Sequence, residues 1–268
     1  MQFALRVFIW HFWVSLFLAL CAMGVIFGLW FPYPYREISG GSQIFLMVIG
    51  VDAICGPTLI AIIANPKKSK RELIADFFFI GAIQLAALGY GIFSAAEARP
   101  VVLAFEVDRM VAVSASEIDP KELVEAPMNM RSLSWKGPQL VGTRKPSNSD
   151  EMLDALDHSL QGLEPSARPS WWQDVSNNAP DIRLRAKKVS DLVAVSSPES
   201  QILLNNAIEK SGLPVGGLFY LPLTSRWTKE WVVLFAEPMN IVGYASVDGF
   251  STSAQSAHKN PEAIKAAK

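Results

Sequence analysis

Cysteine is scarce in this chain, with two residues among 268, and histidine is hardly more common, with three. Cys21 and Cys55 both lie in long apolar segments, so the more polar remainder of the chain cannot rely on disulfides. His158 has no second histidine or cysteine near it in sequence, so a zinc site is not supported. His158, one helical turn after Asp154, fits a solvated helix surface. We therefore expect no bound metal.

Charged residues are also few, at 18% of the chain, and they sum to a formal net charge of -1. Nucleic-acid-binding proteins carry an excess of Lys and Arg, so this balance argues against a nucleic-acid partner. The chain has no glycine-rich phosphate loop and no G-x-S-x-G motif. In the absence of a catalytic motif, we expect a protein that is not an enzyme and that uses no cofactor.

Apolar residues, by contrast, make up 50% of the chain, and the mean hydropathy is +0.24. This is too apolar for an ordinary soluble domain and too mixed for a transporter with many spans. The apolar surplus lies before residue 100, and most Asp, Glu and Ser residues follow it. The pattern predicts a transmembrane domain over residues 1–98, a soluble domain over 99–250 and a disordered polar tail over 251–268.

Three apolar runs are long enough to cross a bilayer, which takes roughly 20 helical residues. They cover about residues 7–31, 43–64 and 73–95. The first run exceeds the apolar core of a signal peptide and no A-x-A cleavage site follows it, so we expect it to remain as an anchor. The sequence therefore predicts three transmembrane helices.

The orientation follows from the basic residues of the short connections. Four of them lie between the second and third runs: Lys67, Lys68, Lys70 and Arg71. The connection before the second run has only Arg36, which Glu37 balances. We therefore expect residues 65–72 and the amino terminus in the cytoplasm. With three spans, the domain after Arg99 would lie in the periplasm of a bacterium, and the protein in the inner membrane.

The sequence of the soluble domain predicts an α+β fold. β-Branched apolar runs predict strands at 101–107, 110–114, 217–223, 231–237 and 241–247. Two helices are expected, one starting at Ser149 as its cap and ending at Gly162, and one with Ser197 as its cap and Gly212 after its end. Neighbouring strands at the carboxyl end predict a mainly antiparallel sheet with helices on one face.

The segment 164–180 is predicted to be a loop or lid, and it contains Trp171 and Trp172. These two tryptophans either form an exposed contact with a partner or pack in the core. Since the domain shows no catalytic constellation, we interpret it as a binding module.

Asp52 is unusual because it lies within the second apolar run. At about 1.5 Å per residue it is about 18 Å from the cytoplasmic end, close to the bilayer midplane. A lipid-facing aspartate there costs on the order of 3 kcal/mol, so it should face another helix. The same count puts Gln84 of the third run at about the same depth. A protonated Asp52 can then bond to Gln84, with Gly56 allowing close approach and Pro57 adding a kink.

Two alternatives remain for this midplane site. Asp52 and Asp76 could form the dyad of an intramembrane aspartyl protease, but their depths differ by about 12 Å, too far to share a proton. Alternatively, Asp52 or Gln84 receives a polar group from the transmembrane helix of a partner.

The residues 39–120 carry a family resemblance. The shared elements are Gly50-x-Asp52, Gly56-Pro57, NPKK at 65–68, Glu72-Leu73 with Asp76, Gln84-Leu85, Tyr90-Gly91, Arg99-Pro100, and Phe105 with Asp108-Arg109. In this combination the segment resembles the type IV pilin accessory protein family, of the TfpX and TfpZ type. The resemblance rests on the two apolar runs of this segment and on the first strand of the soluble domain.

The resemblance implies an inner-membrane, chaperone-like accessory protein that binds one cognate major pilin and supports its stability or its assembly into a pilus. It implies contact with membrane lipid, and the inner-membrane pilus assembly machinery is a further candidate partner. A pilin before assembly has an apolar amino-terminal helix and a periplasmic head. On this hypothesis the spans hold the pilin helix near Asp52 and Gln84, while the soluble domain contacts the head.

Two other classes stay open. A membrane-anchored sensor would bind a small ligand in the periplasm, but the cytoplasmic segments are too short to hold a signalling domain. The intramembrane protease is the other, and it has no positive motif beyond its two aspartates.

Overall fold

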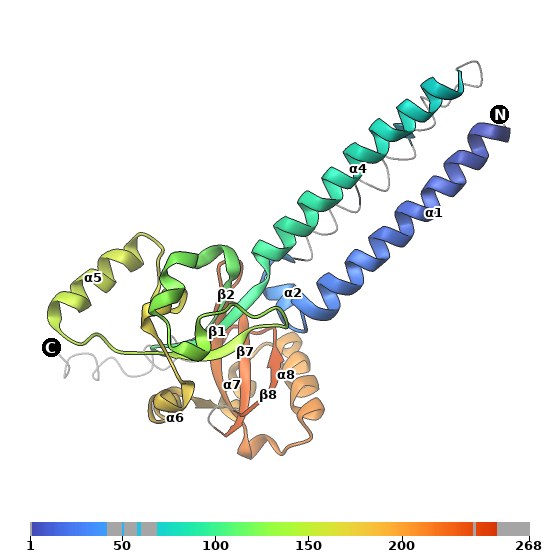
Figure 1. Cartoon of the computed structure of the whole chain (residues 1–268). Coiled ribbons are helices and arrows are strands. Elements are labelled where there is room, and N and C mark those ends of the chain that lie inside the picture. The colour runs from blue at the N-terminus through green and yellow to red at the C-terminus, as the bar shows by residue number, and fades with distance from the viewer. Residues whose placement is uncertain (1, 42–49, 51–57, 60–68, 238–239, 251–268) are drawn as a thin grey trace. The chain divides into compact units, whose positions relative to one another are not determined.

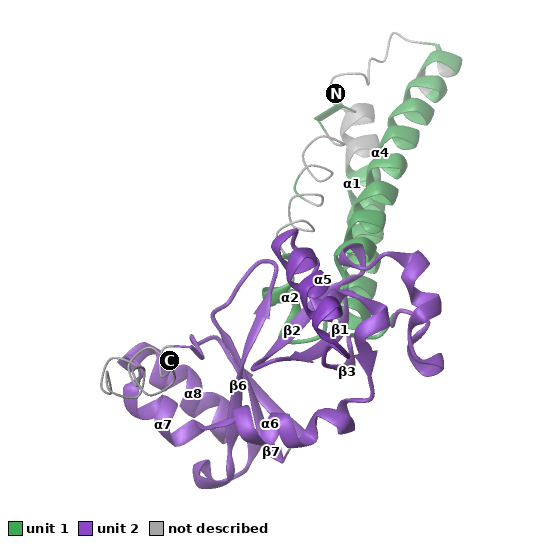
Figure 2. Cartoon of the chain, turned by 90° about the vertical axis from the view of Figure 1, so that its left-hand side faces the viewer, with its two compact units in different colours: residues 1–99, 135–137 green, residues 100–134, 138–268 purple. Residues whose placement is uncertain are grey.

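The computed structural model describes residues 2–41, 50, 58–59, 69–237 and 240–250. By its internal contacts the chain divides into two compact units, which Figure 2 colours separately. The first, here called the helical unit, comprises residues 1–99 and 135–137. The second, the globular unit, comprises residues 100–134 and 138–268.

The helical unit is built on two long helices. α1 spans Gln2–Val25 and continues as a π-helical turn, η1, over Ile26–Trp30; a short α2 spans Tyr35–Ile38, and α4 spans Lys70–Ala98. A capping box starts α4: the Ser69 hydroxyl accepts from the Glu72 amide, and the Glu72 carboxylate accepts from the Ser69 amide. This box satisfies two of the amide groups that a helix leaves free at its start.

The carboxyl-terminal parts of α1 and α4 pack together. Buried Ile26, Trp30 and Phe31 form one cluster with Ala95, and Ala96 and Ala98 pack against it. Small side chains on α4 let the bulky ones of the first helix approach closely. Because the last turns of both helices meet, α1 and α4 run in the same direction, as Figure 1 shows.

Trp135 is counted with the helical unit because of its contacts. Its ring centroid lies 5.7 Å from that of Trp30, and the guanidinium carbon of Arg99 lies 3.9 Å from the same ring centroid. Arg99 itself is buried. The cation and the two indoles, whose planes are tilted by 48°, thus form one cluster beside the carboxyl ends of α1 and α4.

The prediction of three transmembrane helices is wrong for the structure as described. Two helices of the described residues, not three, are long and apolar enough to cross a membrane: Ile9–Trp30 and Ile74–Ala98. The run predicted at 43–64 lies outside the described residues, apart from Gly50, Thr58 and Leu59. The prediction rested on hydropathy alone, and an apolar run of sufficient length does not by itself establish a helix.

The globular unit contains an eight-stranded sheet in the order β4-β3-β1-β2-β6-β7-β8, with β5 paired to β6. The strands are β1 Pro100–Glu106, β2 Arg109–Ser114, β3 Gln139–Thr143, β4 Trp172–Gln173, β5 Lys187–Lys188, β6 Phe219–Ser225, β7 Trp231–Glu237 and β8 Asn240–Ala245. All five predicted strands are present, as β1, β2, β6, β7 and β8, with ends within about two residues of those expected.

The sheet is mixed, which corrects the prediction of a mainly antiparallel one. β1 pairs parallel to β3, and β2 pairs parallel to β6, both near the centre of the sheet. Hairpins supply antiparallel pairs at β1–β2, β6–β7 and β7–β8. The parallel pairs follow from long connections between strands, which sequence neighbours do not reveal.

Within the described residues, four α-helices accompany the sheet: α5 Ser149–Leu160, α6 Ala179–Arg185, α7 Val189–Val195 and α8 Pro198–Ser211. The cap of α8 is Ser197, as predicted, and Gly212 ends it at φ +68°. The predicted cap of α5 is wrong, because the Asn148 side chain accepts from the Glu151 amide and Ser149 is already helical. Asn is as good a cap as Ser, so sequence alone did not choose between them.

Short 3₁₀ turns fill most of the remaining connections: Ala115–Glu117, Pro120–Glu125, Met128–Met130, Pro165–Ala167, Pro169–Trp171, Val175–Asn178 and Val215–Gly217. The predicted loop 164–180 therefore contains three such turns, strand β4 and the start of α6. Two clusters of buried residues form part of the core of the described globular unit. One joins β1 and β2 to Trp172, and the other joins α7 and α8 to β6 and β7.

Candidate functional site

The residues predicted for the membrane site are only partly described. Asp52, Gly56, Pro57, Lys67 and Lys68 lie outside the described residues. Lys70 and Arg71 occupy the first turn of α4, and Gln84 lies near its middle. The Gln84 Nε2 atom is buried and has no hydrogen-bond partner among the residues that the structure describes. The bond between Asp52 and Gln84 stays a prediction.

Trp171 and Trp172 are both buried, with 3% and 4% of their surfaces exposed. Trp172 packs in the core, and its Nε1 donates to the Ser166 carbonyl at 2.8 Å. The Trp171 ring lies under the Arg144 guanidinium, with 4.5 Å between the guanidinium carbon and the ring centroid. Neither ring offers an exposed surface by itself, and a partner contact at these residues stays a prediction. Trp171, however, borders a cleft.

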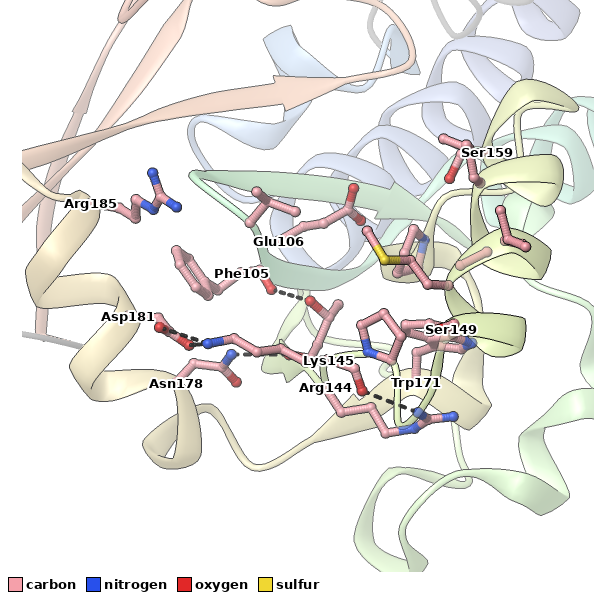
Figure 3. Close-up of a pocket in the computed structure, with 18 residues that line it drawn as sticks. Phe105, Glu106, Arg144, Lys145, Ser149, Ser159, Trp171, Asn178, Asp181 and Arg185 are labelled. Atoms are coloured by element: carbon pink, nitrogen blue, oxygen red, sulfur yellow. Dashed lines mark hydrogen bonds and ion pairs between the residues drawn. The ribbon is translucent and has the colours of Figure 1, made fainter. Parts of the chain in front are cut away.

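This cleft has a volume of about 620 Å³ and lies in the globular unit, between α5, α6 and the carboxyl ends of β1 and β3 (Figure 3). The parallel pairing of β1 and β3 sets Phe105 beside Gly142. The ends of the two strands therefore reach the same edge of the sheet, where Glu106, Val107 and Arg144 line the cleft. Crevices at the carboxyl ends of parallel strands are a common place for binding sites.

One wall of the cleft is the apolar face of α5. Met152, Leu153 and Leu156 line it, and they are 63%, 65% and 60% exposed. Leu160, one turn further on, is 81% exposed. No residue of α5 is buried. The helix is amphipathic, yet its apolar face packs against nothing that covers it within the described chain.

The floor of the cleft is a polar network. Asn178 Nδ2 donates to the Thr143 carbonyl at 3.0 Å, and Gln173 Nε2 donates to Asn178 Oδ1 at 2.7 Å. The Thr143 hydroxyl donates to the Phe105 carbonyl at 2.9 Å. Gly142 is required here, since a Cβ at this position would lie 1.8 Å from Asn178 Oδ1. These buried bonds fix the end of β3 relative to β1 and α6.

The rim carries cations held by ion pairs. Arg144 Nη2 lies 2.6 Å from Glu151 Oε1 on α5, and Lys145 Nζ lies 2.9 Å from Asp181 Oδ2 on α6. The hydrogen bond from Arg144 lowers the pKa of Glu151 to about 2. Arg185 also lines the cleft, and no ion pair or hydrogen bond of its guanidinium is found within the described residues. Among the described residues, two of the three cations at the rim are therefore paired with acids and the third, Arg185, is not.

Glu106, at the end of β1, is a buried carboxyl group with 8% of its surface exposed. It accepts a hydrogen bond from the Ser166 amide at 2.8 Å. Burial raises its pKa, and the nearby Glu164 adds to the rise, although the bonds to Ser166 oppose it. The folded protein therefore favours the neutral form of Glu106 more than the unfolded chain does.

We expect Glu106→Gln to raise the unfolding midpoint of the full-length protein in detergent by roughly 2–4 °C at pH 7.5. A raised folded-state pKa gives stability that is fully present below the unfolded value of 4.5 and is lost as pH rises through the folded pKa. Glutamine cannot ionise, so the gain should vanish near pH 4. Thermal unfolding between pH 4 and 8 measures this. Glu125→Gln, on the surface, is the control, and a variant that is destabilised at every pH would contradict the expectation.

Curated relatives match most of this chain. The fimbrial assembly protein of serogroup I from Dichelobacter nodosus is 34% identical over 240 residues, which are 90% of this chain and 93% of the relative. The chain belongs to the fimbrial assembly protein family. A serogroup E1 relative from the same organism matches with the same identity and coverage. The resemblance to type IV pilin accessory proteins is thereby confirmed.

Two further comparisons match only part of the chain. The family model described as "Fimbrial assembly protein FimB" matches residues 1–40, within the helical unit. The fimbrial assembly protein of serogroups C1 and C2 is 41% identical over 116 residues, 43% of this chain and 88% of that relative. No solved structure matches the chain.

Sequence reasoning missed the cleft. Its polar residues carry no motif, since Arg144 and Lys145 follow β3 whereas Asn178 ends the 3₁₀ turn before α6. The apolar positions of α5 did give a signal, because Leu153, Leu156 and Leu160 recur at helical spacing within an acidic segment. Whether that stripe is covered could be learned only from the structure.

Proposed function

We propose that this protein is an inner-membrane fimbrial assembly factor, not an enzyme, that binds its cognate major pilin and supports pilin stability and pilus assembly. Relatives that share both units of the chain are named fimbrial assembly proteins. The observation that carries the binding role is the cleft of the globular unit, whose α5 wall exposes large apolar side chains. Exposed apolar patches of this kind usually mark interaction sites.

The proposed orientation places the amino ends of α1 and α4 on the cytoplasmic side. Lys70 and Arg71 lie in the first turn of α4, directly after Lys67 and Lys68 in the sequence, and Arg6 lies near the start of α1. Cytoplasmic flanks of membrane helices are enriched in such residues. Because α1 and α4 run in the same direction, one orientation suits both, and the globular unit then follows α4 in the periplasm.

Gln84 is the proposed contact site for the pilin within the membrane. A buried amide without a described partner is costly in lipid, where no water can replace the missing bond. We propose that a polar group of the pilin helix reaches this amide when Asp52 does not occupy it.

Purification of the tagged full-length protein from cells in mild detergent tests the proposed function. The cognate major pilin should co-purify, and a strain lacking the protein should carry far fewer pili at normal pilin synthesis. A photocrosslinker at Gln84 should capture pilin more than one at Ile83, which is 64% exposed on the same helix. Normal piliation together with no pilin in the purified sample would refute the proposal.

A further inference from the structure

We propose that the cleft between α5 and the ends of β1 and β3 receives an amphipathic α-helix of the pilin, with leucine-like side chains on one face and an acidic residue beside them. This inference rests on the proposed function and assigns the contact to one surface of the globular unit. It predicts which side chains recognise the partner, and it makes no use of the membrane helices.

The first support is the contrast between two helices of similar length. α8 buries Leu204 and Ala207 against the sheet, whereas α5 buries no residue. The apolar side of α5 therefore contributes little to the core. Exposing several leucines to water is unfavourable, so a partner that covers them lowers the free energy.

The spacing of the exposed residues suits a helical partner. Leu153, Leu156 and Leu160 follow one another at i, i+3 and i+7, which forms a ridge along one face of α5. Leu153 and Leu160 are seven residues apart, which is about 10.5 Å along the helix axis, so this ridge matches about two turns of a second helix. Helix-in-groove recognition uses anchors at the same spacing.

The chemistry of the walls also favours a helix over an extended segment. A helix satisfies its own backbone groups, whereas an extended segment needs backbone partners from the site. The α5 wall offers side chains only, because the amides and carbonyls of a helix are bonded to each other. The other walls are lined in part by Phe105, Val107 and Trp171, which are also apolar residues.

The charges at the rim point to an acidic residue on the partner. The ion pairs with Glu151 and Asp181 hold Arg144 and Lys145 in place. Arg185 adds a third cation, and no acid within the described residues pairs with it. A carboxylate on the incoming helix would complete that pair at the edge of an apolar contact, where water is partly excluded.

A second copy of this chain fits the surface less well. Asp150 and Asp157 lie beside the leucine ridge on one flank of α5, so two α5 helices packed antiparallel by their apolar faces would bring these like charges together. The same acids repel an anionic lipid surface. The pilin is therefore the occupant that we infer, and the alternatives are outcomes of the test.

The direct test places a photocrosslinking amino acid at Leu156 of the full-length protein in cells that make the pilin. Ile202 on α8 is the matched control, since it is 61% exposed and Leu156 is 60% exposed. We expect pilin adducts from position 156 and none from 202. Adducts between two copies of this chain, adducts with lipid alone, or equal pilin adducts from both positions would overturn the inference.

Charge and apolar contacts are tested separately by substitution. Leu156→Asp should reduce co-purified pilin by about tenfold or more, and Ile202→Asp should not. Arg185→Glu should also reduce it, whereas Arg183→Glu, two residues earlier on α6 and outside the cleft, should not. Protease resistance of each variant shows whether the fold is kept.

The two levels of proposal can fail independently. If pilin co-purifies with the wild-type protein and also with Leu156→Asp and Arg185→Glu, the inference about the cleft is wrong and the proposed function stands. If the wild-type protein captures no pilin in any format, the proposed function fails with it.

Discussion

Replacement of Trp172 by alanine is expected to lower the free energy of unfolding of the globular unit by about 3–5 kcal/mol. The indole is 4% exposed and packs in one cluster with Val102, Met130 and Val141. Alanine leaves a cavity there, and it also leaves the Ser166 carbonyl without the Nε1 donor at 2.8 Å. The free energy of unfolding of most domains is only about 5–15 kcal/mol, so the variant should accumulate poorly in cells.

Denaturant unfolding of the full-length protein in detergent measures the change, with two variants for comparison. Trp227→Ala removes an indole that is 58% exposed and should cost little. Trp172→Phe keeps most of the volume but loses the hydrogen bond, and should cost about 1–3 kcal/mol. Equal unfolding curves for Trp172→Ala and Trp227→Ala would show that Trp172 is not the core residue described.

The second large effect is expected at Gly142. A Cβ there would lie 1.8 Å from Asn178 Oδ1, and no side chain can tolerate that approach. In Gly142→Ala, Asn178 must move away and lose its bonds with Thr143 and Gln173. Because these groups are buried or half-buried, we expect a loss of about 2–4 kcal/mol. The floor of the cleft moves as well, so pilin capture should fall.

A double-mutant cycle shows whether the collision is the cause. Asn178→Ala removes the side chain that the new methyl group meets, so the pair Gly142→Ala with Asn178→Ala should cost less than the sum of the single variants. Gly217→Ala is the matched control, because no heavy atom lies within 4 Å of a Cβ there. Strict additivity of the two substitutions would contradict the explanation.

The sequence predicted those elements whose signals are local. β1 and β7 are apolar, β-branched runs of seven residues, and α8 has a serine cap, a proline at its first position and a terminal glycine. β4 and β5 have only two residues each, and α6 and α7 have seven. Elements this short depend on tertiary contacts, which residue patterns do not contain.

The candidate site was predictable only in fragments. Trp171 and Trp172 stand out in the sequence. That Trp171 borders the cleft whereas Trp172 packs in the core follows from the path of the chain between α5 and α6. Thr143 and Asn178 are brought together by the antiparallel pairing of β3 with β4, and the parallel pairing of β1 with β3 adds Phe105; sequence distance conceals both pairings. The mixed order of the sheet was missed for the same reason. Hydropathy located α1 and α4 but overstated the number of candidate spans.

The exposed face of α5 has a consequence for how a partner is released. Since this helix buries none of its residues, unwinding it forfeits few core contacts and costs little free energy compared with opening α8. Part of the binding energy of any partner must then be spent on keeping α5 wound. Affinity is lowered by that amount and dissociation is faster. Under the proposed function, reversible binding of this kind would allow a bound pilin to be released into the pilus, whereas tight retention would prevent its release.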